Sequence, residues 1–219
     1  MKNLLNKNLK NRIFTSFVLF FLTSLIFFFN SILIYSLIII TVISIIEFLS
    51  ISKKIIKSRL YLYPLNIIFI LYIFTFSIMF FFFSSFPHLK VILFILLLGC
   101  IASDIGGYIF GKLFKGPKLT KISPNKTFSG AIGSIILTCF AVSFLIFNLT
   151  ENISFAILIV AIVTSLFCQL GDLFFSLLKR KAKVKDTGNI LPGHGGVLDR
   201  IDGLLVGIPF GFIALTLLH

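Results

Sequence analysis

The sequence is poor in charged residues, and acids are the scarcest of them. Asp and Glu together number seven in 219 residues, against twenty Lys and Arg, and charged residues make up only 12% of the chain. A soluble domain carries about 25% charged residues. Hydrophobic residues reach 58%, and several apolar runs exceed the roughly 18 residues that mark a membrane-spanning helix. The composition therefore excludes an ordinary soluble domain and predicts an all-α polytopic membrane protein.

Two other patterns are missing. Short segments of alternating polarity, which a transmembrane barrel would need, do not occur. The three cysteines, Cys100, Cys139 and Cys168, share no C-x-x-C spacing and lie inside apolar segments. They are interpreted as small packing residues, which excludes a metal or disulfide framework built from cysteine.

The apolar runs predict seven transmembrane helices, with ends defined to within a few residues. The first run follows a basic start, as in a signal peptide, but it is long for a signal-peptide core and lacks an A-x-A-like end. We therefore interpret it as a retained helix. The third span contains Pro64 followed by a phenylalanine-rich run, so it could be kinked or could include a re-entrant piece. The predicted spans are 13–29, 32–50, 61–84, 91–110, 130–148, 153–178 and 203–218.

The cations are unevenly distributed along this topology. Nineteen of the twenty lie in the N-terminal tail or in the segments 51–60, 111–129 and 179–202, and Lys90 alone lies on the other side. The positive-inside rule then places the N-terminus in the cytoplasm and the C-terminus outside. The excess of Lys and Arg is then explained by membrane topology and by contact with anionic lipid headgroups. Nucleic acid is therefore not expected as a partner.

We expect a multi-pass protein of the cell (inner, cytoplasmic) membrane with its active site at the cytoplasmic face. Two parts are predicted. Residues 1–90 hold the first three spans, and residues 91–219 form a catalytic membrane domain with cytoplasmic loops 111–129 and 179–202.

Because acids are expensive in a membrane, each one is informative. Glu47 and Glu151 lie near span ends and are expected to snorkel or to be solvated. Five aspartates lie at or near cytoplasmic helix ends, and Asp172 shares one helix face with Ser165, Gln169, Ser176 and Lys179. For Ser165 and Gln169, hydrogen bonding between helices and a functional role remain equally open. For Asp172 and Lys179 we favour function. The five aspartates are Asp104, Asp172, Asp186, Asp199 and Asp202.

The stretch "KDTGNILPGHGGVLDRID", residues 185–202, is the most polar part of the chain. A helix is predicted to start near Val197, which would put Asp199 and Asp202 on its first turns. The helix dipole is a sufficient explanation for two acids there. Several carboxylates converging on one pocket would also hold a hard divalent cation such as Mg²⁺.

Small residues recur every four positions in two predicted helices, at Gly99, Ser103, Gly107 and Gly111 and at Gly203, Gly207 and Gly211. Close helix packing is the expected role of both stripes. Asp104 and Tyr108 lie beside the first stripe and are expected to line a pocket. The basic loop 112–130 is not a Walker A loop, but its lysines and hydroxyls near a helix start suit a polyphosphate.

These residues resemble the phosphatidate cytidylyltransferases, also called CDP-diacylglycerol synthases. The signature of that family reads S-x-x-K-R, then K-D, then P-x-H-G-G-x-x-D-R-x-D, and here it spans 27 residues without a gap. The stretch 123–127 and the pair Gly171-Asp172 also look like family elements. Residues before about 100 match only as generic spans. The matching residues are Ser176, Lys179, Arg180, Lys185, Asp186, Pro192, His194, Gly195, Gly196, Asp199, Arg200 and Asp202.

The resemblance implies the reaction of CTP with phosphatidic acid to give CDP-diacylglycerol and pyrophosphate, with Mg²⁺ and a possible second, monovalent or divalent, cation. It implies metal ligation by Asp172 and Asp199, supported by Asp186 and Asp202, with Lys179 and Arg200 also catalytic. His194 would be either a phosphate donor or a brace of the loop. A homodimer through the small-residue faces is a further expectation. Phosphate contacts are assigned to Lys126, Ser176, Lys179, Arg180, Lys185, His194, Gly195, Gly196 and Arg200.

Two positions depart from the family pattern, since Ser129 and Phe175 stand where the family often has Glu. Rival functions are a CTP-dependent lipid or polyprenol kinase and, from a different class, an ion-coupled transporter using Asp104 and Asp172. A CDP-alcohol phosphatidyltransferase is disfavoured because its D-G-x-x-A-R pattern is missing. Polar groups at one membrane face, and not at the midplane, argue against the transporter.

Overall fold

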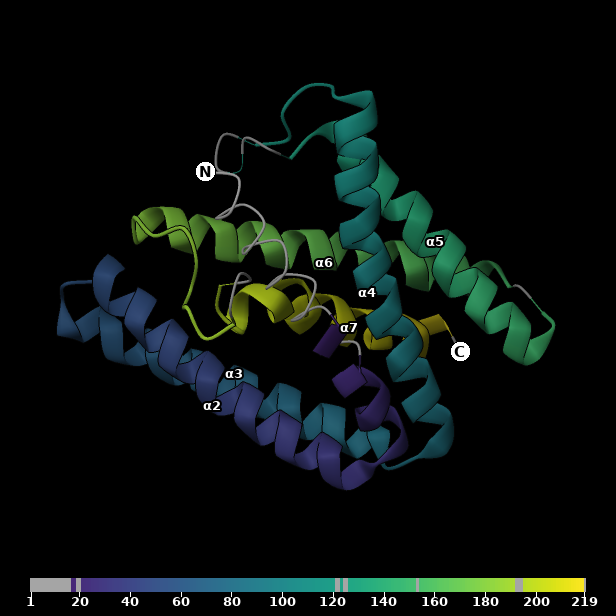
Figure 1. Ribbon diagram of the computed structural model, residues 1–219, viewed down its shortest axis with the longest axis horizontal. Helices are drawn as coiled ribbons and strands as arrows, with labels where there is room; N and C mark the ends of the chain where they lie inside the picture. Colours follow the sequence, from purple (N-terminus) through teal and green to yellow (C-terminus); the bar gives the residue numbers. More distant parts are fainter. Residues whose placement is uncertain are drawn as a thin grey trace. The chain divides into compact units, whose positions relative to one another are not determined.

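The computed structural model describes residues 17–18, 21–120, 123, 126–152, 154–191 and 195–218. Within these residues the chain is helical, and its β structure is limited to two isolated bridges. The predicted span 13–29 lies partly outside them, and its residues 21–28 are helical. The long helices are α2 (Asn30–Ile55), α3 (Arg59–Ser84), α4 (Pro87–Phe114), α5 (Phe128–Thr150), α6 (Phe155–Lys181) and α7 (Leu198–Leu218) (Figure 1).

All six helices are long and apolar enough to cross a membrane, which confirms the predicted all-α polytopic class. Five of them cover a predicted span and extend beyond it, because polar residues at the span ends continue the helix, whereas α6 starts at Phe155, two residues inside the predicted span 153–178. Pro64 lies in the second turn of α3, which runs unbroken from Arg59 to Ser84. Proline near a helix start removes few backbone bonds, so no re-entrant piece forms there.

The chain divides into two compact units, and the division does not follow one cut in the sequence. The first unit comprises Met1–Ser85 with Leu178–Arg200, and the second comprises Phe86–Leu177 with Ile201–His219. The polar segment 178–200 therefore groups with the N-terminal helices. The contacts of Glu47 described below are the physical reason.

In the first unit, α2 and α3 pack as a pair. The Phe48 and Phe69 rings stack with centroids 3.7 Å apart. The Ser52 hydroxyl donates to Asn66 Oδ1 at 2.7 Å. Hydrogen bonds of this kind join helices in a membrane, because lipid provides no water to bond with polar side chains.

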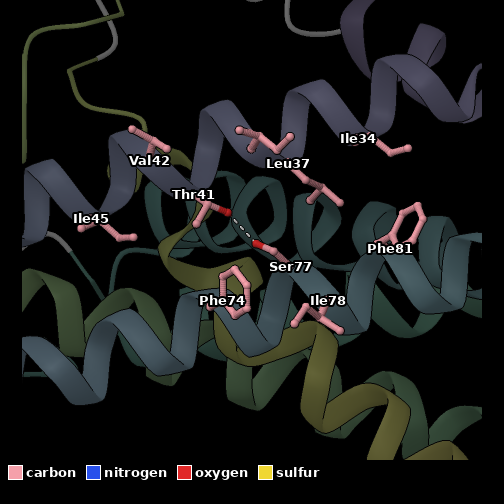
Figure 2. Close-up of a pocket in the computed structure, with 10 residues that line it drawn as sticks. Ile34, Leu37, Thr41, Val42, Ile45, Phe74, Ser77, Ile78 and Phe81 are labelled. Atoms are coloured by element: carbon pink, nitrogen blue, oxygen red, sulfur yellow. Dashed lines mark hydrogen bonds between the residues drawn. The ribbon is translucent and has the colours of Figure 1, made fainter.

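A second hydroxyl contact joins the same helices beside an apolar groove. Thr41 Oγ1 and Ser77 Oγ are 2.6 Å apart, and Figure 2 shows them pointing toward one another between α2 and α3. Because the Ser77 hydroxyl donates to Ile73 O at 2.9 Å, Thr41 is the donor to Ser77. The groove has a volume of about 450 Å³ and an otherwise aliphatic and aromatic lining, as expected of a surface that meets acyl chains.

In the second unit, the predicted small-residue stripe of α4 packs against α5. A Cβ on Gly99 would lie 2.9 Å from Val142 Cγ2, and one on Gly107 would lie 2.8 Å from Ser134 Oγ. Thr138 adds a hydrogen bond from its hydroxyl to Gly99 O at 3.2 Å. The packing role expected for this stripe is confirmed.

The stripe of α7 is also a packing surface. A Cβ on Gly203 would lie 2.7 Å from Cys168 Sγ, and one on Gly207 would lie 2.8 Å from Cys100 Sγ. Both thiols are buried and free, and Cys139 is free and half-buried. The prediction that the cysteines are packing residues is confirmed.

Candidate functional site

A polar pocket of about 260 Å³ opens in the second unit, in a region where most other side chains are apolar. Asp104 and Tyr108 line it, as predicted from their position beside the small-residue stripe. The pocket brings residues of α4, α5 and α6 together with the loop before α5. Its lining comprises Ser103, Asp104, Gly107, Tyr108, Leu119, Ser123, Lys126, Thr127, Gly130, Ala131, Ser134, Gln169 and Asp172.

Asp172 of α6 and Lys126 form an ion pair in this pocket. Both side chains are about a third exposed or less, at 31% for Asp172 and 26% for Lys126, so the pair remains open to a ligand from solution. The Ser176 hydroxyl lies 3.4 Å from Asp172 Oδ1, one helical turn further on. Three residues singled out from the sequence are thus brought together.

The loop between α4 and α5 folds tightly enough to place Lys126 here. Leu119 N donates to Lys126 O at 2.8 Å. The Thr127 hydroxyl accepts from Gly130 N at 3.1 Å and caps the start of α5. Ser129 donates to Lys115 O at 2.8 Å. This serine therefore holds the loop against the end of α4.

The two open assignments on α6 are now resolved in part. Ser165 Oγ lies 3.0 Å from Ser103 Oγ and is fully buried, so it joins α6 to α4. Gln169 donates to Ala131 O at 3.3 Å and also lines the pocket. Ser165 is a packing residue, whereas Gln169 serves both packing and the pocket wall.

A second polar cluster, the loop cluster, lies in the first unit around Asp199. Asp199 Oδ1 accepts from Lys179 Nζ at 2.6 Å. Asp199 Oδ2 accepts from Thr187 N at 2.8 Å and from Gly196 N at 3.1 Å, and the Thr187 hydroxyl oxygen lies 3.0 Å from it. This carboxylate therefore holds Lys179, Thr187 and Gly196 together.

Glu47 belongs to this cluster, and the sequence-based prediction for it was wrong. It was expected to snorkel or to be solvated, but its side chain is only 3% exposed. Its carboxylate accepts from Val197 N at 3.0 Å, from Leu198 N at 2.9 Å and from the Thr187 hydroxyl at 2.7 Å. The first backbone N–H groups of a helix lack partners within it, and Glu47 supplies an acceptor for two such groups at the start of α7.

The remaining predicted residues are placed as follows. Arg180, Lys185, Asp186 and Arg200 are exposed members of the first unit. Asp202 belongs to the second unit and is 9% exposed, with Oδ1 accepting from Gly203 N at 2.9 Å. Gly195 has φ +84°, a left-handed conformation that favours glycine, and buried Gly196 donates to Asp199. His194 and Pro192 lie outside the described residues.

Among the described residues, no group of three or more His, Cys, Asp or Glu side chains is close enough to enclose a metal ion. What the chain offers is carboxylates paired with lysines, in the pocket and in the loop cluster. Such pairs can exchange partners with an anionic ligand and its counter-cation. The chemistry is that of phosphate and metal–phosphate binding.

Glu47 and Thr187 are the residues that sequence reasoning missed. Glu47 is the one acid in the 26 residues of α2, and an isolated acid in an apolar span usually marks function. That signal was present but was discounted because Glu47 lies near a span end. Nothing in the sequence indicates its partners, which are 140 to 151 residues away.

Comparison with known proteins gives one family. Residues 2–218 match the model of the cytidylyltransferase family. The match covers nearly the whole chain, including the N-terminal helices that carry no recognisable motif.

Among curated proteins, the chain is similar to several bacterial phosphatidate cytidylyltransferases. It is 40% identical to that of Mycobacterium leprae over 126 residues, which are 57% of this chain and 40% of the relative. It is 46% identical to that of Staphylococcus haemolyticus over 109 residues, 49% of this chain and 42% of the relative. For Bacillus subtilis the identity is 43% over 120 residues, 53% of this chain and 44% of the relative. The match thus spans less than half the length of these three relatives.

Proposed function

Since this chain belongs to the cytidylyltransferase family, we propose that it transfers the cytidylyl group of CTP to phosphatidic acid, releasing pyrophosphate and leaving CDP-diacylglycerol in the membrane. The observation that carries the proposal is the Asp172–Lys126 pair at a polar pocket of a membrane-helix unit. It unites two family motifs that are 46 positions apart in the sequence.

The proposed reaction needs charge neutralisation more than acid–base chemistry. A phosphate oxygen of phosphatidate attacks the α-phosphorus of CTP, and the bond from that phosphorus to the bridging oxygen of the β-phosphate breaks. Pyrophosphate leaves with the bond electrons. The nucleophile is already an anion, so a strong general base is unnecessary. Two anions must instead be brought together, which requires fixed positive charge and close positioning.

Lysine and arginine side chains are the proposed source of that charge. Lys126 lines the pocket and is proposed to contact CTP phosphates. Lys179, Arg180, Lys185 and Arg200 are proposed phosphate contacts in the polar segment, the arginines through bidentate bonds. Gly195 lacks a side chain and is proposed to let a phosphate approach the backbone, whereas the N–H of Gly196 already donates to Asp199.

The donor set fits Mg²⁺. Asp172 and Asp104 line the pocket with hydroxyl groups around them, and oxygen donors of this kind are what Mg²⁺ prefers. Mg²⁺ is commonly held by one or two carboxylates together with substrate phosphates, so the lack of a three-acid group among the described residues agrees with an ion that arrives with the nucleotide. When bound, Mg²⁺ would neutralise phosphate charge and polarise the α-phosphoryl group.

Asp172 is the proposed first ligand, with Asp104 beside it in the pocket. Asp199 is proposed to act through Oδ1, which now accepts from Lys179, while its Oδ2 keeps the backbone of the polar segment in place. Asp186 and Asp202 keep the supporting roles assigned from the signature. In this proposal Asp172 and Oδ1 of Asp199 bind the ion, whereas Oδ2 of Asp199 holds the loop backbone in place.

We also propose that the protein resides in the cytoplasmic (inner) membrane and acts at its cytoplasmic face. The support is the distribution of cations, nineteen of twenty in the tail and loops on one side of the predicted topology. CTP is water-soluble, so a site on that side gives the nucleotide access to a lipid headgroup.

The kinase alternative transfers a different phosphorus atom, so the products separate the two functions. Purified protein in phosphatidate-containing vesicles with CTP and Mg²⁺ should release pyrophosphate and form a CDP-lipid, dependent on both substrates. Release of CDP with a newly phosphorylated lipid would instead establish the kinase. Ion-driven uptake by sealed vesicles without nucleotide turnover would establish the transporter.

A further inference from the structure

The buried carboxylate of Glu47 holds together parts of the first unit that are distant in sequence. It projects from α2 and is 3% exposed. It accepts backbone hydrogen bonds from Val197 and Leu198 at 3.0 and 2.9 Å, and a hydroxyl hydrogen bond from Thr187 at 2.7 Å. The two ion pairs between described residues do not include Glu47, so its charge is stabilised by these donors.

The glycines of the polar segment are shaped around this carboxylate. A Cβ on Gly188 would lie 2.5 Å from Glu47 Oε1, and a Cβ on Gly196 would lie 2.5 Å from Glu47 Oε2. Real Cβ atoms do not approach an oxygen so closely, so a side chain at either position would displace the Glu47 carboxylate or the backbone. Part of the glycine content of this segment therefore serves an internal contact and not a ligand.

Thr187 connects Glu47 to Asp199. Its hydroxyl oxygen lies 2.7 Å from Glu47 Oε2 and 3.0 Å from Asp199 Oδ2, while its backbone N–H donates to Asp199 Oδ2 at 2.8 Å. A hydroxyl has one proton, so it donates to one carboxylate at a time. Asp199 in turn holds Lys179. Displacing Glu47 would thus shift the residues that orient Asp199 and Lys179.

We propose that Glu47 is a positioning residue for the polar segment: from α2 it fixes Thr187, Val197 and Leu198 and thereby the placement of Asp199 and Lys179. The test by kcat rests on the cytidylyl transfer proposed above. The test by hydrogen exchange does not. The N-terminal helices then contribute to the reaction beyond anchoring the chain in the membrane.

The substitution Glu47→Gln tests this with almost no change of shape. In either orientation of the amide, its NH₂ faces a backbone N–H, that of Val197 or that of Leu198, so at least one hydrogen bond is lost. Misplacing reacting groups by about 1 Å costs on the order of 100-fold in rate. We expect kcat to fall about 100-fold and KM for CTP to rise by a smaller factor, because Lys126, the proposed phosphate contact in the pocket, does not depend on Glu47. Glu47→Asp keeps the charge and should recover part of the rate.

Hydrogen exchange provides the readout that does not depend on activity. Amides of residues 187–198 should exchange faster in Glu47→Gln protein, whereas those of α4 and α5 should keep the wild-type rate. The matched control is Glu151→Gln, the same substitution at the other glutamate of the chain, which is exposed. It should change neither kcat nor exchange. Wild-type kcat and wild-type exchange in Glu47→Gln protein would overturn the proposal.

If Glu47→Gln protein is unfolded, shown by fast exchange in α4 and α5 as well, Thr187 variants decide the question. Thr187→Val removes the hydroxyl link and should lower kcat and speed exchange in 187–198, while Thr187→Ser should match the wild type. Equal behaviour of the two variants would refute the link. If wild-type protein forms no CDP-lipid, the proposed function fails, and exchange alone still supports or overturns the role of Glu47.

Discussion

At the scale of single residues, the acids of this chain are stabilised in two ways. Asp172 is partly exposed in a pocket and paired with Lys126, whereas Glu47 is buried and surrounded by hydrogen-bond donors. An unpaired charge would be costly in either place. The partly exposed acid can exchange its partner for a ligand, and the buried acid cannot do so without disrupting the loop.

Asp172→Asn should separate these roles. The ion pair is partly solvated, and such pairs contribute about 0–1 kcal/mol to stability, so the variant should reach the membrane and melt within a few degrees of the wild type. Loss of a proposed metal ligand should lower turnover by at least about 100-fold. The measurement is pyrophosphate release by protein matched for amount, with Glu151→Gln as control. Wild-type turnover would remove Asp172 from the site.

The sequence allowed Asp172, Lys126, Asp104 and Tyr108 to be singled out because polar residues at helical spacing are conspicuous among apolar ones. It did not allow Glu47 to be assigned, since its partners come from a segment more than 130 positions further along the chain. Contacts of that range depend on which helices pack together, and apolar periodicity in membrane helices does not determine this.

At the scale of helices, close approach depends on small residues. The spans were predictable because a membrane helix needs about 20 apolar residues, and the stripe on α4 indicated a packing face. The sequence did not identify α5 as its partner. The structure gives that partner through Gly133 and Ser134.

Two adjacent glycines of α4 give a matched pair of variants. A Cβ on Gly106 would meet the backbone oxygen of Gly133 at 2.5 Å, whereas one on Gly107 would meet Ser134 Oγ at 2.8 Å. Backbone cannot rotate away, but a side chain can adjust. Gly106→Ala should therefore lower stability by about 1–3 kcal/mol, as overpacking does, and Gly107→Ala by less. Thermal unfolding in detergent measures both, and the reverse order would contradict this packing.

At the scale of the whole molecule, the chain is a multi-pass membrane protein whose polar residues gather in two clusters. The second unit holds the pocket with Asp172, and the first unit holds the segment around Asp199. The sequence indicated one continuous catalytic part from residue 91 onward. That division stays a prediction, and contacts from Glu47 group residues 178–200 with the N-terminal helices.

Membrane topology can be tested with single cysteines. Lys90→Cys should be labelled by an impermeant thiol reagent in intact cells, because Lys90 lies opposite the other cations. Lys57→Cys should be labelled only after the membrane is opened. The native protein is the control for its own thiols, since Cys100 and Cys168 are buried and Cys139 is half-buried within α5. Labelling of Lys57→Cys in intact cells would show that the orientation is the reverse of the predicted one.

The central claim is that the cytidylyl group of CTP, which includes the α-phosphorus, is transferred to phosphatidic acid. Its most direct test follows radioactive phosphorus from CTP into lipid, in vesicles that contain phosphatidate and the purified protein. Label at the α-position should enter the lipid fraction, and label at the γ-position should appear only in pyrophosphate. Label from the γ-position in the lipid, with none from the α-position, would contradict the account.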